Sequence, residues 1–167
     1  KKVDEDGNAL GGAMIGLFRT DDGEFTKENA LMTTTSAEDG SFSFENIPCG
    51  TWYVREIEQP TGFVLDDTIY PVTIGTDGQV VEIEIVNEYG RGNIHLTKVD
   101  SEYPDNKLTG AVFEVYKDSN NNSKLDEGDE LLGTLTEKEI GEYGMNDLFY
   151  GRYFVKETKA PDGFVLD

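Results

Sequence analysis

The sequence predicts an all-β protein built from two tandem modules, each an antiparallel sandwich or barrel. Three observations lead to this fold class. Apolar residues recur at every second position in short runs, Asp-Gly pairs separate these runs, and the same ordered series of segments occurs twice. Alternation at every second position places the apolar side chains on one face of a strand. The Asp-Gly pairs lie at residues 6–7, 22–23, 39–40 and 77–78.

The strands follow in chain order from the alternating runs. In the first module the apolar positions are Ala13, Ile15 and Leu17, then Trp52 and Val54, then Val81, Ile83 and Ile85. In the second they are Ile94 and Leu96, then Ala111, Phe113 and Val115, then Tyr153 and Val155. Residues 24–31, between two runs of the first module, allow a short helix.

The internal repeat sets the domain organisation. Residues 2–18 align with residues 98–116, and residues 40–56 align with residues 141–157. The offset is 96 residues at the first pair and 101 at the second, so the second copy carries additional residues between them. A repeat of this size corresponds to one small domain.

A glycine-bearing link at residues 89–92 joins the two modules. We therefore predict a complete domain over residues 1–90 and a second domain over residues 91–167. The counterpart of residues 67–89, which form the closing strands of the first copy, is absent from the second. A sandwich without these strands exposes a sheet edge. Because the chain starts inside a strand-like run, it reads as a piece of something longer.

Composition and charge exclude several classes of protein. The formal net charge is −20, from 34 acidic and 14 basic residues, and such a surface repels the phosphates of nucleic acids. The acidic residues are scattered through turns, which favours a solvated exterior and invites only divalent cations. No run approaches the roughly 18 apolar residues of a membrane helix, so we expect no membrane insertion. The single cysteine, Cys49, excludes an internal disulfide.

Three kinds of strand carry a polar side chain on their apolar face. Asn87 continues the inward positions of the run that ends the first module. Glu56 does the same after Trp52 and Val54, and Glu157 repeats the arrangement in the second copy. Lys98 falls in line with the apolar residues before it, and its counterpart Lys2 opens the first copy.

A lysine, a glutamate and an asparagine directed into one core can react. Burial lowers the pKa of a lysine and raises that of a glutamate, which favours the uncharged forms. A neutral amine is a nucleophile, a protonated carboxyl can polarise an amide and shuttle protons, and proximity replaces an external catalyst. The expected product is a Lys–Asn isopeptide bond with loss of ammonia. The alternative is a buried salt bridge capped by the asparagine, or a lysine that reaches solvent.

Several spaced motifs occur in a fixed order. They are KVD at 2–4 and 98–100, F-x-N-I-P-x-G-x-W-x-V-x-E at 44–56, E-x-x-x-P-x-G-F at 56–63 and 157–164, and IVN at 85–87. With these motifs the chain resembles the collagen-adhesin B-type domains (CnaB, or SpaA-like) of Gram-positive surface proteins and pilins. The resemblance covers essentially the whole chain.

The resemblance implies a prealbumin-like (immunoglobulin-like) β-sandwich for each module, the second lacking its closing strands. It also implies a spontaneous Lys–Asn (sometimes Lys–Asp) bond between the first and last strands, promoted by the glutamate of the E-x-x-x-P motif. Carried over, Lys2 is the donor, Asn87 the acceptor and Glu56 the catalytic residue. In the second module only Lys98 and Glu157 are present, and the matching acceptor would lie beyond residue 167. No cofactor is required.

The second module also carries a loop with EF-hand-like spacing. Side chains at positions 1, 3, 5, 9 and 12 and a carbonyl at position 7 would be supplied by Asp118, Asn120, Asn122, Asp126, Asp129 and Lys124. Oxygen ligands at this spacing suit Ca²⁺, and calcium-loaded loops of similar pattern occur in B-type repeats of staphylococcal-like adhesins. Two departures are Ser123 in place of the glycine at position 6 and an aspartate instead of glutamate at position 12. The alternative is a polar hairpin loop that needs no metal.

Together these features predict a structural stalk or pilin-type module of a bacterial cell-surface protein, stiffened by the crosslink. We expect it outside a Gram-positive cell, attached to the wall, with neighbouring domains of a longer protein as partners. A single intramolecular reaction is not turnover, so we expect no enzyme. The alternatives are an adhesin module that binds a host matrix protein or glycan directly, and an accessory domain of a carbohydrate-active enzyme. An exposed aromatic patch would favour either alternative.

Overall fold

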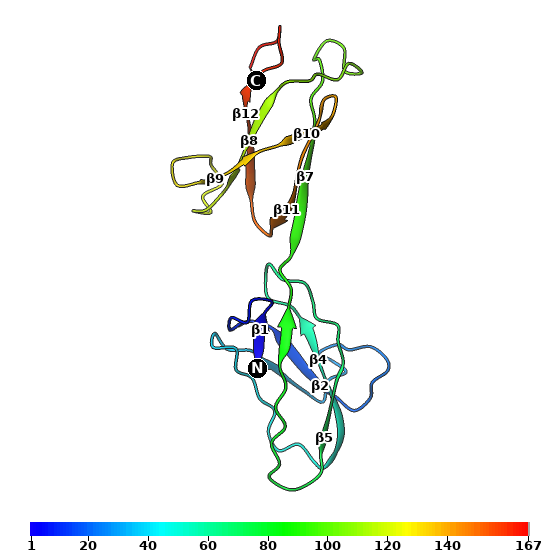
Figure 1. Ribbon diagram of the computed structural model, residues 1–167. Helices are drawn as coiled ribbons and strands as arrows, with labels where there is room; N and C mark the ends of the chain where they lie inside the picture. Colours follow the sequence, from blue (N-terminus) through cyan, green and yellow to red (C-terminus); the bar gives the residue numbers. More distant parts are fainter. Residues whose placement is uncertain (167) are drawn as a thin grey trace. The chain divides into compact units, whose positions relative to one another are not determined.

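The computed structural model describes residues 1–166 (Figure 1). The chain divides into two compact units, Lys1–Gly90 and a second that begins at Arg91. Every regular element in the described residues is a β-strand, which confirms the predicted all-β class. The same residues contain no helix long and apolar enough to cross a membrane.

The first unit contains six strands in two sheets. A four-stranded antiparallel sheet has the order β3-β2-β4-β5, and a two-stranded sheet pairs β1 with β6. The bounds are β1 Lys2–Asp4, β2 Met14–Phe18, β3 Met32–Thr35, β4 Gly50–Glu58, β5 Tyr70–Ile74 and β6 Ile85–Asn87.

The core of the first unit consists largely of apolar side chains on the inward face of the four-stranded sheet. Ile15 and Leu17 of β2 are fully buried, and β4 buries every second residue from Trp52 through Val54 to Glu56. Removing apolar side chains from water in this way is the main stabilising contribution to such a fold. The alternation therefore delivers Glu56 to the same interior as its apolar neighbours.

Strands β1 and β6 pair in parallel, while every other strand pair described is antiparallel. In this register Lys2 lies opposite Ile85, and Asp4 lies opposite Asn87. A parallel pair cannot be closed by a hairpin, and here most of the unit separates the two strands. The alternating run at 81–87 suggests a longer last strand than the one observed, which begins only at Ile85.

Up to residue 166, the second unit contains six strands in two antiparallel sheets, ordered β10-β11-β7 and β12-β8-β9. The bounds are β7 Arg91–Thr97, β8 Val112–Lys117, β9 Glu130–Thr134, β10 Thr136–Glu139, β11 Glu142–Phe149 and β12 Tyr153–Lys159. The rings of Phe113 and Tyr143 meet edge-on in its core, with centroids 5.0 Å apart. Among the described residues, no strand pairs with residues 98–100 as β6 pairs with β1.

The two units place their glutamates in the same register. Glu56 of β4 lies opposite Ile15 of β2, and Glu157 of β12 lies opposite Phe113 of β8. Ile15 and Phe113 are also equivalent in the sequence repeat. The repeat therefore preserves the pairing and the register of β2 with β4 in the pairing of β8 with β12.

Residues 24–31 form turns instead of the short helix that the sequence allowed. The backbone N–H of Ala30 donates to the carbonyl of Thr26, which closes a single turn. The ring of Phe25 packs edge-on against Phe18, with centroids 4.9 Å apart. This tertiary contact holds the segment against β2, and one isolated turn does not propagate into a helix.

Candidate functional site

Three polar side chains meet inside the first unit, each from a different strand. Lys2 comes from β1, Glu56 from β4 and Asn87 from β6, with exposed fractions of 0%, 1% and 0%. The alternation of β4 turns Glu56 inward, and the parallel pairing of β1 with β6 brings the lysine and asparagine strands together. Residues that are far apart in the sequence thus share one buried site.

The carboxylate of Glu56 connects the other two side chains. Its Oε2 accepts hydrogen bonds from Nδ2 of Asn87 at 2.6 Å and from the backbone N–H of Asp66 at 2.8 Å. Its Oε1 lies 4.0 Å from Nζ of Lys2, which is an ion-pair distance and too long for a hydrogen bond. Among the described residues, this Oε1 has no hydrogen-bond partner.

Backbone carbonyls hold the amine and the amide. Nζ of Lys2 donates to the carbonyls of Ile85 at 3.2 Å and Val3 at 3.3 Å. Nδ2 of Asn87 donates to the carbonyl of Val64 at 2.5 Å. Within the described part of the chain, the buried Oδ1 of Asn87 has no hydrogen-bond partner. Unsatisfied buried polar groups are rare in stable cores, and here one belongs to the carbonyl that a nucleophile would attack.

Burial dominates the electrostatics of the site. Desolvation lowers the pKa of Lys2, although the nearby carboxylates, Glu56 first among them, act in the opposite direction. Desolvation also raises the pKa of Glu56, against the hydrogen bonds from Asn87 and Asp66. Both shifts favour uncharged groups: an amine that is nucleophilic and a carboxyl that can donate a proton. The arrangement can therefore support attack of the amine on the amide.

Two groups of the site escaped the sequence analysis. They are the carbonyl of Val64 and the amide of Asp66, which are backbone atoms and leave no side-chain signal. The available signal was the repeat itself, since the copied stretch continues past Glu56 as far as Asp66. The Tyr70 hydroxyl donates to Oδ2 of Asp66 at 2.6 Å, and burial together with this bond raises the pKa of Tyr70 to about 12.

The second unit brings Lys98 and Glu157 together. Nζ of Lys98 lies 3.0 Å from Oε1 of Glu157, and the two side chains are 12% and 4% exposed. The backbone repeats as well, because Lys98 N donates to the carbonyl of Gly141 just as Lys2 N donates to that of Gly40. The predicted lysine–glutamate pair is therefore present in both units.

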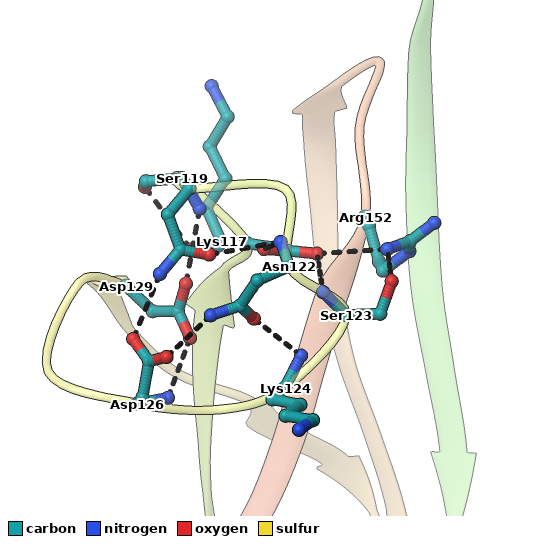
Figure 2. A network of polar contacts seen from close by, with 10 residues as sticks. Lys117, Ser119, Asn122, Ser123, Lys124, Asp126, Asp129 and Arg152 are labelled. Atoms are coloured by element: carbon teal, nitrogen blue, oxygen red, sulfur yellow. Dashed lines mark hydrogen bonds and ion pairs between the residues drawn. The ribbon is translucent and has the colours of Figure 1, made fainter.

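Figure 2 shows the loop between β8 and β9, where the predicted calcium ligands gather. Asp118 is buried, and its carboxylate accepts hydrogen bonds from the backbone N–H groups of Asn122 and Ser123 at 3.1 Å each. Nη1 of Arg152 lies 3.1 Å from Oδ2 of Asp118 and forms an ion pair with it. The first candidate ligand thus already has a cationic partner.

The other candidate ligands contact one another. The Asp126 carboxylate accepts hydrogen bonds from Nδ2 of Asn120 at 2.9 Å and of Asn122 at 2.6 Å. Oδ2 of Asp129 accepts the backbone N–H of Asp126 at 2.9 Å, and Lys124 N donates to Oδ1 of Asn122 at 2.8 Å. In the described residues, no three His, Cys, Asp or Glu side chains are arranged to hold a metal ion. Hydrogen bonds between its own residues, together with the Arg152 ion pair, close this loop in the structure.

This chain is similar to known proteins over nearly its whole length. The family model described as "SpaA: Prealbumin-like fold domain" matches residues 1–89 and 92–167. The serine-aspartate repeat-containing protein D of Staphylococcus aureus is 27% identical over 98% of this chain, which spans 12% of that protein.

Two solved structures are also similar. The TIE protein of Bacillus anthracis is 30% identical, with a TM-score of 0.80 over 99% of this chain and 28% of that one. A streptococcal ancillary pilin is 28% identical, with a TM-score of 0.50 over 98% of this chain and 53% of that one. This chain therefore corresponds to part of each of these proteins.

Proposed function

Because this chain belongs to the SpaA family of prealbumin-like fold domains, we propose that it is a structural stalk or pilin-type module of a Gram-positive cell-surface protein. A spontaneous isopeptide bond between Lys2 and Asn87 stiffens its first domain. Its relatives support the surface class, since they include a staphylococcal serine-aspartate repeat protein and an ancillary pilin. In this role the chain stands between neighbouring domains of a longer, wall-attached protein.

One observation carries the proposal: a single buried carboxyl reaches both the amine and the amide. Glu56 hydrogen-bonds Asn87 and forms the ion pair with Lys2, while all three side chains are withdrawn from water. Burying an amine and a carboxyl without further purpose is costly, because each must give up its hydration. A reaction that converts the Lys2 amine into an amide removes its charge permanently, which would account for the burial of these residues.

The proposed reaction balances without any added reagent. In the reactive form, the proton shared by the Lys2–Glu56 pair resides on the Glu56 carboxyl, so the Lys2 amine is neutral. Nζ of Lys2 attacks Cγ of Asn87, and the Glu56 carboxyl transfers protons between the attacking and leaving nitrogens. A bond forms between Nζ and Cγ, the bond between Cγ and Nδ2 breaks, and one ammonia leaves. Glu56 ends in its starting protonation state, but the crosslink forms only once, so the chain is not a turnover enzyme.

Intact mass spectrometry tests the proposal directly. The wild-type protein should be lighter than its sequence by one ammonia, and Glu56→Ala should have the full mass. Glu157→Ala is the matched control, because it removes the equivalent glutamate of the other unit and should retain the deficit. Peptide mapping should then join the peptide containing Lys2 to the one containing Asn87.

A full mass for the wild type would reject the crosslink. The buried trio would then be a salt bridge with an amide cap, and a module that binds a host protein or glycan directly would become the better hypothesis. An accessory domain of a carbohydrate-active enzyme would also remain open.

As a second function, we propose that the loop at 118–129 binds Ca²⁺. The observation in its favour is that Asn120, Asn122 and Asp129 all hydrogen-bond Asp126, so four of the predicted ligands already lie together. Binding would require Arg152 to release Asp118, and the amides of Asn120 and Asn122 to present oxygen instead of nitrogen to the cation. A site that must rearrange in this way should be weak, in the roughly millimolar range of extracellular modules.

Calorimetric titration with Ca²⁺ tests the loop, with Mg²⁺ as the competing ion. The heat of binding should disappear in Asp126→Ala and persist in Asp22→Ala, which removes an aspartate from a turn of the first unit. Equal heats from both variants would mean that Ca²⁺ associates with the acidic surface in general.

A further inference from the structure

The turn that follows each glutamate has a defined geometry. In the first unit Phe63 N donates to the carbonyl of Pro60 at 3.2 Å, and in the second Phe164 N donates to that of Pro161 at 3.1 Å. The glycine at the third position of each turn has a positive φ, +96° at residue 62 and +88° at residue 163. These features define a type II turn, in which that position requires glycine. The turn therefore forms in both units.

In the first unit this turn runs alongside the residues that follow Asn87. Val64 N donates to the carbonyl of Glu88 at 2.8 Å, and Gly90 N donates to the carbonyl of Gly62 at 2.7 Å. Phe63 forms an antiparallel bridge with Tyr89 between these two bonds. The turn and the end of the last strand are thus joined as a short ladder, which we call the turn ladder (residues 62–64 with 88–90).

The turn ladder orients the amide of Asn87. The Val64 carbonyl accepts a hydrogen bond from Nδ2 of Asn87 at 2.5 Å. A backbone carbonyl only accepts, so it selects the nitrogen of the amide and turns the carbonyl oxygen away from itself. In the proposed reaction Nδ2 is the leaving atom, and Val64 therefore fixes where the leaving ammonia is held.

Tyr89 ties the turn ladder to the first strand. Its ring lies 5.1 Å from that of Phe63, and its hydroxyl donates to Oδ2 of Asp4 at 2.8 Å. Asp4 is the residue opposite Asn87 in the parallel pairing of β1 with β6. The hydrogen bond to Asp4 and burial raise the pKa of Tyr89 to about 12, so the hydroxyl remains a donor at neutral pH.

We propose that Tyr89 is a positioning residue for the crosslink, acting through the turn ladder and Asp4 to hold the Asn87 amide in line with Lys2. This inference rests on the proposed Lys2–Asn87 bond and adds to it a residue outside the reacting trio. In the hydrogen bonds described, the Tyr89 hydroxyl contacts the carboxylates of Asp4 and, at 3.2 Å, of Asp6, and none of the reacting atoms. Small errors in the placement of reacting groups have large effects on rate, because productive geometry is narrow.

The test follows crosslinking in time after cell-free synthesis. Samples of the full chain are quenched in acid, and the fraction lacking one ammonia is measured by intact mass. Tyr89→Phe removes only the hydroxyl and should slow the reaction about tenfold. Tyr53→Phe removes the hydroxyl of a half-buried tyrosine on β4 and should react at the wild-type rate.

A second variant perturbs the turn ladder without touching Tyr89. A Cβ at residue 90 would lie 3.1 Å from the carbonyl oxygen of Gly62, so Gly90→Ala should press the two segments apart. We expect it to slow crosslinking as well. Wild-type rates in both Tyr89→Phe and Gly90→Ala would overturn the positioning role, while crosslinking of the wild type would leave the proposed function standing.

Two further readouts separate positioning from a loss of fold. In a Glu56→Ala background, where no crosslink forms, Tyr89→Phe should leave the unfolding midpoint nearly unchanged; a fall that accounts for the slower rate would make Tyr89 merely structural and overturn the inference. Across the pH profile, Tyr89→Phe should lower the crosslinking rate by the same factor at every pH. A displaced profile would mean that Tyr89 acts through protonation of Lys2 or Glu56, and it would also overturn the inference. If the wild type never loses ammonia, the proposed function fails and the positioning role fails with it.

Discussion

The two units contain equivalent lysine–glutamate pairs, with the glutamates in the same register, but the distance between amine and carboxylate differs. In the second unit Nζ of Lys98 lies 3.0 Å from Oε1 of Glu157, which is a close ion pair. In the first unit Nζ of Lys2 lies 4.0 Å from Glu56, whose other oxygen accepts a hydrogen bond from Asn87.

The difference shows what the amide contributes. Where an asparagine shares the carboxyl, Nζ of the lysine lies farther from it and donates to the backbone carbonyls of Ile85 and Val3. In a buried site, a greater distance from a carboxylate makes the protonated form of a lysine less favourable. In the proposed reaction the asparagine is thus the acceptor, and its hydrogen bond to Glu56 accompanies the longer distance between Lys2 and that carboxylate.

Among the variants considered, Asn87→Ala should have the largest effect on the stability of the first unit. Without the amide, the first unit should lose the crosslink, and Lys2 should close on Glu56 to the distance seen in the second unit. The crosslink closes a loop that spans nearly the whole unit, which lowers the conformational entropy of the unfolded chain. This contributes about 4 kcal/mol to the free energy of unfolding. Denaturant titration followed by Trp52 fluorescence measures this loss in the first unit alone, since Trp52 is the single tryptophan.

The exposed Asn146→Ala is the control for that experiment, and it should unfold with the wild-type midpoint of Trp52 fluorescence. An Asn87→Ala variant as stable as the wild type would contradict the proposed bond.

Glu157→Ala should lower the free energy of unfolding of the second unit by a somewhat smaller amount. It leaves Lys98 largely buried without its carboxylate, and removal of one partner from such a pair costs about 3 kcal/mol. Hydrogen exchange of the β8 and β12 amides measures the effect where it occurs. Unchanged protection would mean that the Lys98 amine reaches water once its partner is removed.

Crosslinking should depend on pH, and this dependence should occur in the first unit only. The reactive form carries one proton on the Lys2–Glu56 pair, placed on the carboxyl. At low pH both groups are protonated and the amine is no longer a nucleophile; at high pH the carboxyl is ionised and cannot donate. The lowered pKa of Lys2 and the raised pKa of Glu56 bring these limits toward each other.

We therefore expect a bell-shaped rate profile that falls about tenfold per pH unit on each side, or about 1.4 kcal/mol per unit. The time course after cell-free synthesis, repeated across pH, measures it. A rate that rises steadily with pH would show that Glu56 is not needed in its protonated form.

The smallest effect is expected at a surface pair in the second unit. Arg91 and Asp147 are 3.1 Å apart, but their side chains are 38% and 69% exposed. Water screens such a pair, so Asp147→Asn should change the free energy of unfolding by no more than about 0.5 kcal/mol. The contrast with Glu157→Ala in one denaturation series would show that burial, and not distance, sets the contribution of each pair.

Much of this arrangement could be predicted from the sequence. Alternation alone placed Glu56 and Asn87 on inward faces, because side chains of a strand point to one face at every second residue. The repeat then predicted two tandem domains built from the same series of segments. These features depend on local pattern, which the sequence carries directly.

Other features depend on contacts that no local pattern records. The Val64 carbonyl is a backbone atom, and its role depends on how the turn lies against the last strand. Arg152 reaches Asp118 from 34 residues away, so the spacing of the loop could not reveal it. The short helix allowed near Phe25 was wrong because packing of that ring against Phe18 outweighed weak local propensity.

The parallel pairing of β1 with β6 decides how the first unit would respond to a pull on its two ends. The chain enters at one end of this pair and leaves at the other, so tension would load the paired strands in shear. With the proposed bond in place, the force would pass from Lys2 through two side chains to Asn87, and the residues between them would lie outside the load path. In single-molecule stretching, this unit should then give no unfolding step, behaving as an inextensible link.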